Sequence, residues 1–420
     1  MTPKLLTTLK TYTWPLFAAD VFAGVTVAMV ALPLSLAIAI ASGADPANGL
    51  VTAIVAGLLI SLLGGSRVQI GGPTGAFIVV VYGVIAQHGY DGLVLATLMA
   101  GIILLIAGTL RAGNLIQFIP EAVVNGFTMG IAVIIATSQL KDLLGLEIAN
   151  LPADFLHKLP ALWDARATLN PAALGIGLAT IGLIVLFRRL APKWPGLIVA
   201  VGLTSAAAIG FGWPVESIAD RFGALPDHLP MPRFPDISLA RLQELLPSAF
   251  VIAFLAGVES LLSAMVADRM IAGQHRPNAE LIAQGAANVG SSLFGGLPAT
   301  GAIARTATNV KAGGKTPVAG IVHAVTILLV MMLAAPLAGK LALPALAGLL
   351  MLTAWNMSEP HKWREHALLP LEDRGLLLLT LVLTVVADLT VAIGVGVGLG
   401  LALRLRRRNA PPAGWDTPER

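Results

Sequence analysis

Long apolar runs separated by short polar loops extend along the whole chain. A helix needs about 20 apolar residues to cross a bilayer. Clear runs of this kind cover 20–42, 47–64, 91–111, 117–138, 171–190, 195–213, 246–266, 316–338, 374–389 and 390–407. Shorter or interrupted apolar stretches cover 73–86, 276–294, 301–312 and 341–355. Together they predict an all-α polytopic membrane protein with fourteen transmembrane segments.

The composition indicates that lipid is the natural solvent of this chain. Of its 420 residues, 56% are hydrophobic and only 12% are charged, whereas soluble domains carry roughly 25% charged residues. The mean hydropathy is +0.83. The chain has no cysteine, which excludes disulfides, thiolate metal sites and cysteine nucleophiles.

Lysine and arginine lie in short clusters between the apolar runs, as topology determinants do. If the N-terminus is cytoplasmic, most of them fall in cytoplasmic loops and at the chain ends, and the polar stretches 141–170 and 214–245 fall on the outer face. We therefore expect a multi-pass protein of the bacterial inner membrane with both termini in the cytoplasm. The net charge of +4 follows from this topology and does not indicate a nucleic-acid partner.

Each half of the chain contains one Gly/Pro-rich break followed by Thr-Gly-Ala and a short apolar run. The breaks cover 71–76 and 295–302, and each falls at the third segment of its half. Seven segments per half place the second half in the opposite orientation. This pattern predicts a 7+7 inverted repeat with short half-helices at segments 3 and 10. The alternative is that the breaks are only packing kinks.

Two half-helices that begin near mid-membrane present unpaired N–H groups and positive dipole ends, which suit an anion. The candidate substrate-binding residues are Thr74, Gly75, Ala76, Thr300, Gly301, Ala302 and Arg305. Arg305 would add a full positive charge. Its alternative role is to neutralise Glu259, and the threonines alternatively serve as helix N-caps.

Glu259 is the only ionisable residue in the apolar run 250–266. A carboxylate inside the membrane is costly, so it indicates a function. We expect it to take up H⁺ or to hold Na⁺ as a coupling ion, with Ser263 one turn later and Thr300 as further oxygen ligands. No other cofactor is expected. The alternative is a structural acid that pairs with a neighbouring helix.

Other polar residues in the apolar segments have simpler interpretations. Asp20 lies near a predicted helix end, where acids are capping or interfacial. Gln284 and Asn288 are expected to form hydrogen bonds between helices, and His323 is interpreted as a packed polar residue.

Several motifs resemble the sulfate permease (SulP) family of anion transporters, in the order that the family has them. They are Asp20–Gly24, 31–34 (Ala-Leu-Pro-Leu), 39–43, 72–75 (Gly-Pro-Thr-Gly), 257–260 (Gly-Val-Glu-Ser) with 267–268, and 298–306 with Asn309. The resemblance implies that an anion binds between the ends of segments 3 and 10, and that the protein is usually a homodimer. Members of the family move sulfate, bicarbonate, chloride or dicarboxylates.

The resemblance also implies a core domain, from segments 1–4 and 8–11, that moves against a gate domain. On this chain the core covers 20–112 and 246–339 and the gate covers 113–245 and 340–408, with cytoplasmic segments at 1–19 and 409–420. Pro33-Leu34 stands where many members have Pro-Gln, which is more similar to BicA-type bicarbonate transporters. The sequence ends too soon after Arg408 for the usual STAS domain, so we expect a membrane domain without STAS, and the alternative is that the sequence is a piece of a longer protein.

Among relatives, BicA-like members have an acid at the position of Glu259 that helps to bind Na⁺, and animal members have an arginine at the position of Arg305 close to the anion. We therefore expect a secondary active transporter that moves a small anion by alternating access, coupled to Na⁺ or H⁺. An uncoupled channel or exchanger, or a nucleobase carrier of the same architecture, is the alternative. No HExxH motif and no evident Ser–His pair occurs, so an enzyme is not expected.

Overall fold

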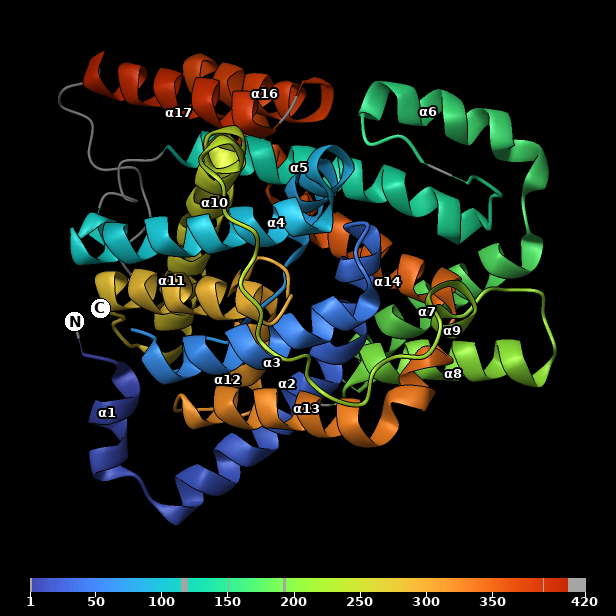
Figure 1. Ribbon diagram of the computed structural model, residues 1–420, viewed down its shortest axis with the longest axis horizontal. Helices are drawn as coiled ribbons and strands as arrows, with labels where there is room; N and C mark the ends of the chain where they lie inside the picture. Colours follow the sequence, from blue (N-terminus) through green and yellow to red (C-terminus); the bar gives the residue numbers. More distant parts are fainter. Residues whose placement is uncertain (1, 115–119, 150, 192–193, 388, 407–420) are drawn as a thin grey trace.

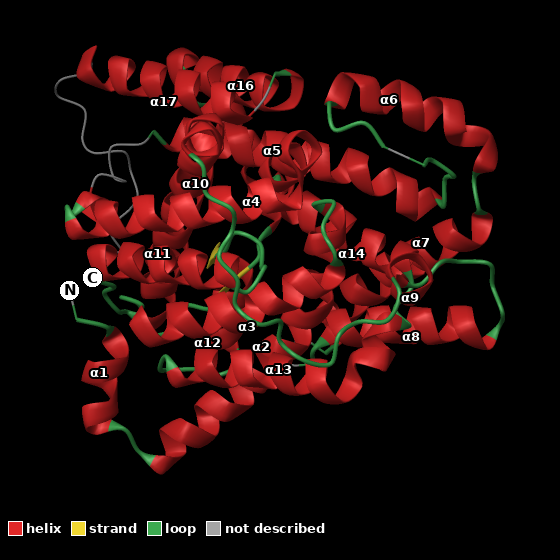
Figure 2. Ribbon diagram, in the orientation of Figure 1, coloured by secondary structure: helices red, strands yellow, loops and turns green. Residues whose placement is uncertain are grey.

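The computed structural model describes residues 2–114, 120–149, 151–191, 194–387 and 389–406. Helices make up most of the described chain (Figure 2), and most of the long ones run side by side along one direction (Figure 1). The N-terminus and α6 lie at opposite ends of that direction (Figure 1). Seven of the described helices are long and apolar enough to cross a membrane.

The first half of the chain contains the elements up to α9. In chain order they are α1 (Lys4–Thr8), η1 (Leu9–Thr11), α2 (Trp14–Ala41), α3 (Pro46–Leu63), β1 (Gly71–Gly72), η2 (Gly75–Phe77), α4 (Ile78–Thr109), α5 (Glu121–Leu144), α6 (Phe155–Asp164), η4 (Ala165–Thr168), α7 (Pro171–Leu190), α8 (Gly196–Gly210) and α9 (Ile218–Phe222).

The second half continues from α10 to the end of the described chain. Its elements are α10 (Leu239–Ile271), α11 (Pro277–Leu293), β2 (Thr300–Gly301), α12 (Ile303–Lys311), α13 (Val318–Gly339), α14 (Leu343–Met357), η5 (Pro360–Lys362), α15 (Trp363–Ala367), α16 (Leu371–Val386) and α17 (Leu389–Arg406). Every apolar segment that the sequence predicts overlaps one of these helices, and the expected tail 409–420 lies outside the described residues.

The division between the predicted segments 73–86 and 91–111 is confirmed, because α4 consists of two helices that meet at Gly89, where the backbone angles (φ 71°, ψ 179°) are not helical. Other helix boundaries differ from the predicted ones. α10 begins at Leu239 rather than 246, because the Ser238 side chain accepts a hydrogen bond from the Arg241 N–H and starts the helix on a polar turn. Hydrophobicity alone does not detect such a turn.

Helices from each half of the chain pack against helices from the other half. α4 from the first half packs on α10 and α11, and α13 from the second half packs on α2 and α3. Between them, β1 and β2 pair antiparallel, with Gly71 opposite Gly301 and Gly72 opposite Thr300. The two interrupted segments therefore meet in the middle of this group of helices.

Buried polar side chains hold the two breaks together. Asn288 on α11 accepts a hydrogen bond from the Ala299 N–H (2.9 Å) and donates one to the Ala299 carbonyl (2.9 Å). Asn309 on α12 donates to the Val68 carbonyl (2.8 Å). The expectation of hydrogen bonds between helices is wrong for both residues, because Asn288 bonds to Ala299 in the loop before β2 and the Gln284 amide donates to Glu280 on the same helix (2.9 Å).

Glu280 is a fully buried acid that the sequence analysis overlooked, because it stands in the first turn of α11 like an ordinary helix-start carboxylate. It accepts hydrogen bonds from the backbone N–H groups of Gly65 (2.8 Å) and Ser66 (3.1 Å) and from the side chains of Gln69 (3.1 Å) and Ser260 (3.2 Å). This carboxylate thereby joins α11, α10 and the chain that leads into β1.

Asp20 and His323 are also buried. Asp20 accepts hydrogen bonds from the N–H groups of Lys315 (2.9 Å) and Thr316 (3.1 Å) and from the Tyr12 hydroxyl (3.0 Å). It is a capping acid, as predicted, but for the chain that leads into α13 rather than for its own helix. His323 is packed in the interior, as predicted.

Replacing Glu280 with alanine would leave several buried donors without a partner. We expect Glu280→Ala to lower the free energy of unfolding by about 3–5 kcal/mol, the cost of breaking a buried charged network. Thermal unfolding of the detergent-purified protein measures this. Glu244→Ala, at an acid whose side chain is 61% exposed, is the control and should change stability by less than about 0.5 kcal/mol. Equal effects of the two substitutions would contradict the structural role of Glu280.

Candidate functional site

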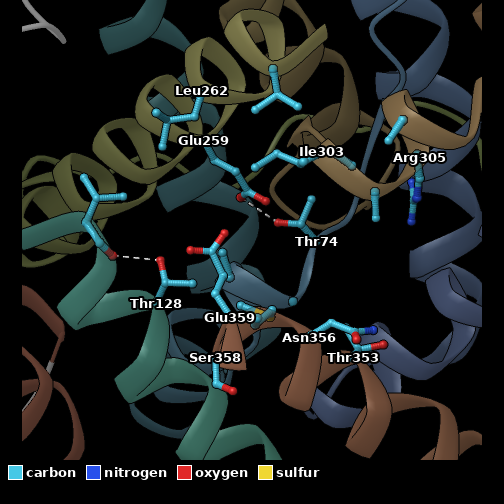
Figure 3. A pocket seen from close by; sticks show the side chains of 18 of the residues that line it. Thr74, Thr128, Glu259, Leu262, Ile303, Arg305, Thr353, Asn356, Ser358 and Glu359 are labelled. Carbon is cyan, nitrogen blue, oxygen red and sulfur yellow. Dashed lines mark hydrogen bonds between the residues drawn. The ribbon is translucent and has the colours of Figure 1, made fainter. Parts of the chain in front are cut away.

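A cavity of about 1680 Å³ is lined by helices from both halves of the chain. One wall comes from the half-helix starts, with Thr74, Gly75, Ala76 and Ala302, and from α10. The opposite wall comes from α5 and α14 (Figure 3). Along α12 the lining continues as far as Lys311 and Ala312, whereas along η2 and α4 it stops at Ala76. The cavity therefore extends from the breaks in the direction of α12.

The first turns of both half-helices face this cavity. η2 begins at Gly75 and α12 begins at Ile303, and the residues before them, Thr74 and Ala302, have extended backbone angles. The first N–H groups of a helix have no partner within it and mark its positive end. The Ala302 N–H is already used, because it donates to the Ile70 carbonyl (2.9 Å). The donors that α12 offers are thus the amides that follow Ala302.

Thr74 links the first half-helix to Glu259. Its hydroxyl donates to the Glu259 carboxylate over 2.9 Å (Figure 3) and makes no N-cap bond. Thr74 is buried, and Glu259 is partly accessible from the cavity. The predicted capping role is therefore not the one that Thr74 has here. Its bond leaves the other Glu259 oxygen without a hydrogen bond among the described residues.

Arg305 lies behind the first break. Its guanidinium donates to the Pro73 carbonyl (2.9 Å) and to the Ser35 hydroxyl (3.1 Å), and the residue is only 1% exposed. Its Nε has no hydrogen-bond partner among the described residues. Arg305 and Glu259 both line the cavity, yet they are not within ion-pair distance of each other. The alternative of a direct Glu259–Arg305 pair is not found in this conformation.

Three predicted site residues do not reach the cavity wall. Thr300 and Gly301 form β2, and the Thr300 hydroxyl donates to the Ala256 carbonyl (2.8 Å). Ser263 is fully buried, and its hydroxyl donates to the Thr306 hydroxyl (3.3 Å) instead of approaching Glu259. The structure thus gathers Thr74, Gly75, Ala76, Glu259, Ala302 and Arg305 at one place, and it leaves Thr300, Gly301 and Ser263 behind them.

The polar residues on the opposite wall are not among those that the sequence predicts. They are Asn125 and Thr128 on α5, Thr353 and Asn356 on α14, and Glu359 directly after α14. In Figure 3 Glu359 points toward Glu259 and Thr74 from across the cavity. A detectable signal exists in both helices, since each has two polar residues three positions apart within an apolar stretch, which places them on the same face of the helix.

A family model described as "Sulfate permease family" matches residues 17–373. This chain belongs to the sulfate permease family. It is 44% identical to "Putative sulfate transporter YvdB" of Bacillus subtilis, over 90% of this chain and 72% of the relative. It is 33% identical to "Bicarbonate transporter BicA" of Picosynechococcus, over 88% of this chain and 67% of the relative.

Solved structures of the family have the same fold. The transmembrane domain of a cyanobacterial bicarbonate transporter BicA superposes with a TM-score of 0.82 and 32% identity, covering 91% of this chain and 99% of that domain. SLC26A9 superposes with a TM-score of 0.84 over 96% of this chain and 68% of that protein, at 18% identity. The predicted family and the predicted polytopic, inverted-repeat fold are confirmed.

The close approach of Arg305 to the first break requires a glycine at position 72. An added Cβ would lie 2.0 Å from the guanidinium, and φ is +151°. We expect Gly72→Ala to destabilise the protein by more than about 2 kcal/mol, because clash and backbone strain add. Gly83→Ala in α4, where a Cβ would meet nothing within 4 Å, should be neutral or slightly stabilising. Thermal unfolding of both variants tests this, and a Gly72→Ala protein as stable as its Gly83→Ala counterpart would contradict it.

Proposed function

We propose that this protein is a secondary transporter that carries a small anion across the membrane by alternating access, coupled to Na⁺ or H⁺. The observation that carries the proposal is the meeting of two half-helix starts from opposite halves of the chain at one cavity, beside a buried arginine and a cavity-facing acid. Enzymatic activity is not part of it, since the members of the family that match are named as transporters.

The electrostatics of the site favour an anion. Two helix starts contribute partial positive charge, and Arg305 adds a full one at the back of the first break. The β1–β2 pair holds the two helix starts close together. The anion would contact the first amides of η2 and α12, near Thr74 and Ala76.

Glu259 is the proposed site of the coupling ion. It lies beside Thr74, so a cation bound there would offset part of the charge of an anion at the adjacent helix starts. Because Ser263 and Thr300 have other hydrogen-bond partners, they would need to reorient before they could act as ligands. The Thr74 hydroxyl is already within hydrogen-bond distance of Glu259 and could act as a ligand of the cation without moving away.

Alternating access needs two bodies that move against each other. The proposed core contains α2–α4 and α10–α13, and the proposed gate contains α5–α9 and α14–α17. The proposed anion site lies on the core side, and Thr128, Asn356 and Glu359 face it from the gate side. Displacement of the core along the gate would carry both ions past this second wall.

The names of the relatives make sulfate and bicarbonate the first substrates to test, with dicarboxylates as a third class.

We further propose that the protein is a homodimer in the bacterial inner membrane. Both termini are then in the cytoplasm, as the basic loops indicate. An uncoupled channel or exchanger remains the alternative, and the partly accessible Glu259 favours the coupled carrier. Arg305 favours an anion over a nucleobase.

Glu259→Gln removes the charge while keeping shape and hydrogen-bonding capacity. We expect this variant to lose uptake driven by a Na⁺ or pH gradient by at least about tenfold, because one missing charge-assisted contact is worth that much. Labelled bicarbonate, sulfate and fumarate uptake into proteoliposomes, with the two gradients imposed separately, is the measurement. Glu244→Gln is the matched control and should transport normally. Unchanged gradient-driven uptake by Glu259→Gln would reject the coupling role.

A further inference from the structure

Lys158 on α6 is a buried lysine outside the proposed anion site. The residue is only 3% exposed, although α6 belongs to a polar stretch between spanning segments. Its ammonium donates to the Ser138 hydroxyl (2.9 Å) and lies 5.6 Å from the centre of the Tyr82 ring. Burial lowers the pKa of Lys158. Burying an ammonium is costly unless its contacts compensate, so this position requires an explanation.

No carboxylate among the described residues lies within ion-pair distance of Lys158. Asp154, one turn earlier on the chain, is engaged with the His157 ring (2.6 Å). The Lys158 ammonium therefore depends on one hydroxyl and one aromatic face. Contacts of this kind form and break more readily than a buried ion pair, which suits a contact that must open.

The contacts of Lys158 join the two proposed moving bodies. Tyr82 belongs to α4 on the core side, and Ser138 belongs to α5 on the gate side. The Tyr82 hydroxyl also donates to the Leu151 carbonyl in the chain between α5 and α6 (2.7 Å). At the end of α2, Gly43 packs against the same ring and would place a Cβ 3.3 Å from it.

This junction lies beyond the closed end of the cavity. Tyr82 follows Thr74 by eight residues on the same half-helix, which places it about 12 Å farther along the helix axis. The cavity lining stops at Ala76 in that direction and includes neither Tyr82, Ser138 nor Lys158. The α6 end is also opposite the N-terminal end of the molecule (Figure 1).

We propose that Lys158 is a positioning residue for transport: it closes the α6 end of the transport path in this conformation, and it must leave Tyr82 before the anion site opens there. This rests on the proposed alternating access. When the core moves toward the α6 end, Tyr82 is carried with α4, whereas Lys158, Ser138 and Leu151 stay with the gate. The Lys158–Tyr82 contact then breaks and the Lys158–Ser138 bond persists.

A substrate-independent test uses the absence of natural cysteines. Met265→Cys on α10 puts one thiol on the cavity wall, and its reaction with a membrane-impermeant thiol reagent reports how often the cavity is open on its own side. We expect Lys158→Met to slow this reaction roughly threefold or more, because it shifts the population toward the conformation that is open at the α6 end. Lys158→Arg, which keeps the charge, should restore most of the rate. An unchanged rate in a folded Lys158→Met protein would overturn the proposal.

A cross-linking test compares two cysteine pairs that share the Lys158→Cys substitution. A short bifunctional thiol reagent should lower anion uptake by the Tyr82→Cys/Lys158→Cys protein at least tenfold, because the cross-link joins the core to the gate. When the reagent contains a cleavable linker, cleaving it should restore uptake. The Ser138→Cys/Lys158→Cys pair lies within the gate and should transport after cross-linking. Continued uptake by the cross-linked Tyr82→Cys pair would contradict the proposal.

The two tests separate failure of this inference from failure of the proposed function. If the parent protein carried none of the tested anions, the transport assignment would fall, while the Met265→Cys reaction rate would still report whether Lys158 controls the open end. If transport were present and the reaction rate did not depend on Lys158, only the role of Lys158 would fall.

Discussion

The antiparallel pairing of Gly71 and Gly72 with Gly301 and Thr300 is the contact on which the rest of this structure depends. Two chain segments that cannot continue as helices satisfy part of their backbone hydrogen bonding with each other, far from water. Because this pairing uses the Ala302 N–H as well, it determines which amides remain for a ligand. The pairing therefore contributes to the orientation of the helix starts, together with the side chains that bond around them.

Buried polar residues make that pairing possible in an apolar interior. Asn288, Asn309 and Glu280 each bind backbone groups of the connecting chains around the two breaks, so that few donors are left without a partner there. Arg305 does the same for the Pro73 carbonyl. Arg305 thus has two roles, since it supports the first break and contributes positive potential to the cavity.

Both walls of the cavity contain hydrogen bonds between distant parts of the chain. The wall with the breaks is built on α10 and α12, and its Thr74 bonds to Glu259. On the other wall the Asn125 amide lies 3.2 Å from His366 Nε2, whereas Thr128 and Thr353 bond to carbonyls of their own helices. In the proposed mechanism the core slides along the boundary between these two walls. The buried Lys158, at the closed end, adds a contact across the same boundary.

The sequence by itself determined the membrane-spanning segments, the family and the two matched breaks. Those features are local, since the length of a hydrophobic run and the position of Gly and Pro residues act over a few turns of chain. Glu259 and Arg305 could be identified because an isolated charged residue in an apolar run can be recognised from the sequence alone. Only the tertiary structure decided that Ser263 and Thr300 bond away from the cavity, that Glu280 is buried, and that Thr128 and Asn356 face Glu259. Side-chain direction at a break depends on which carbonyl or hydroxyl the packing of other helices brings near, and that information lies 40 to 300 residues away along the chain.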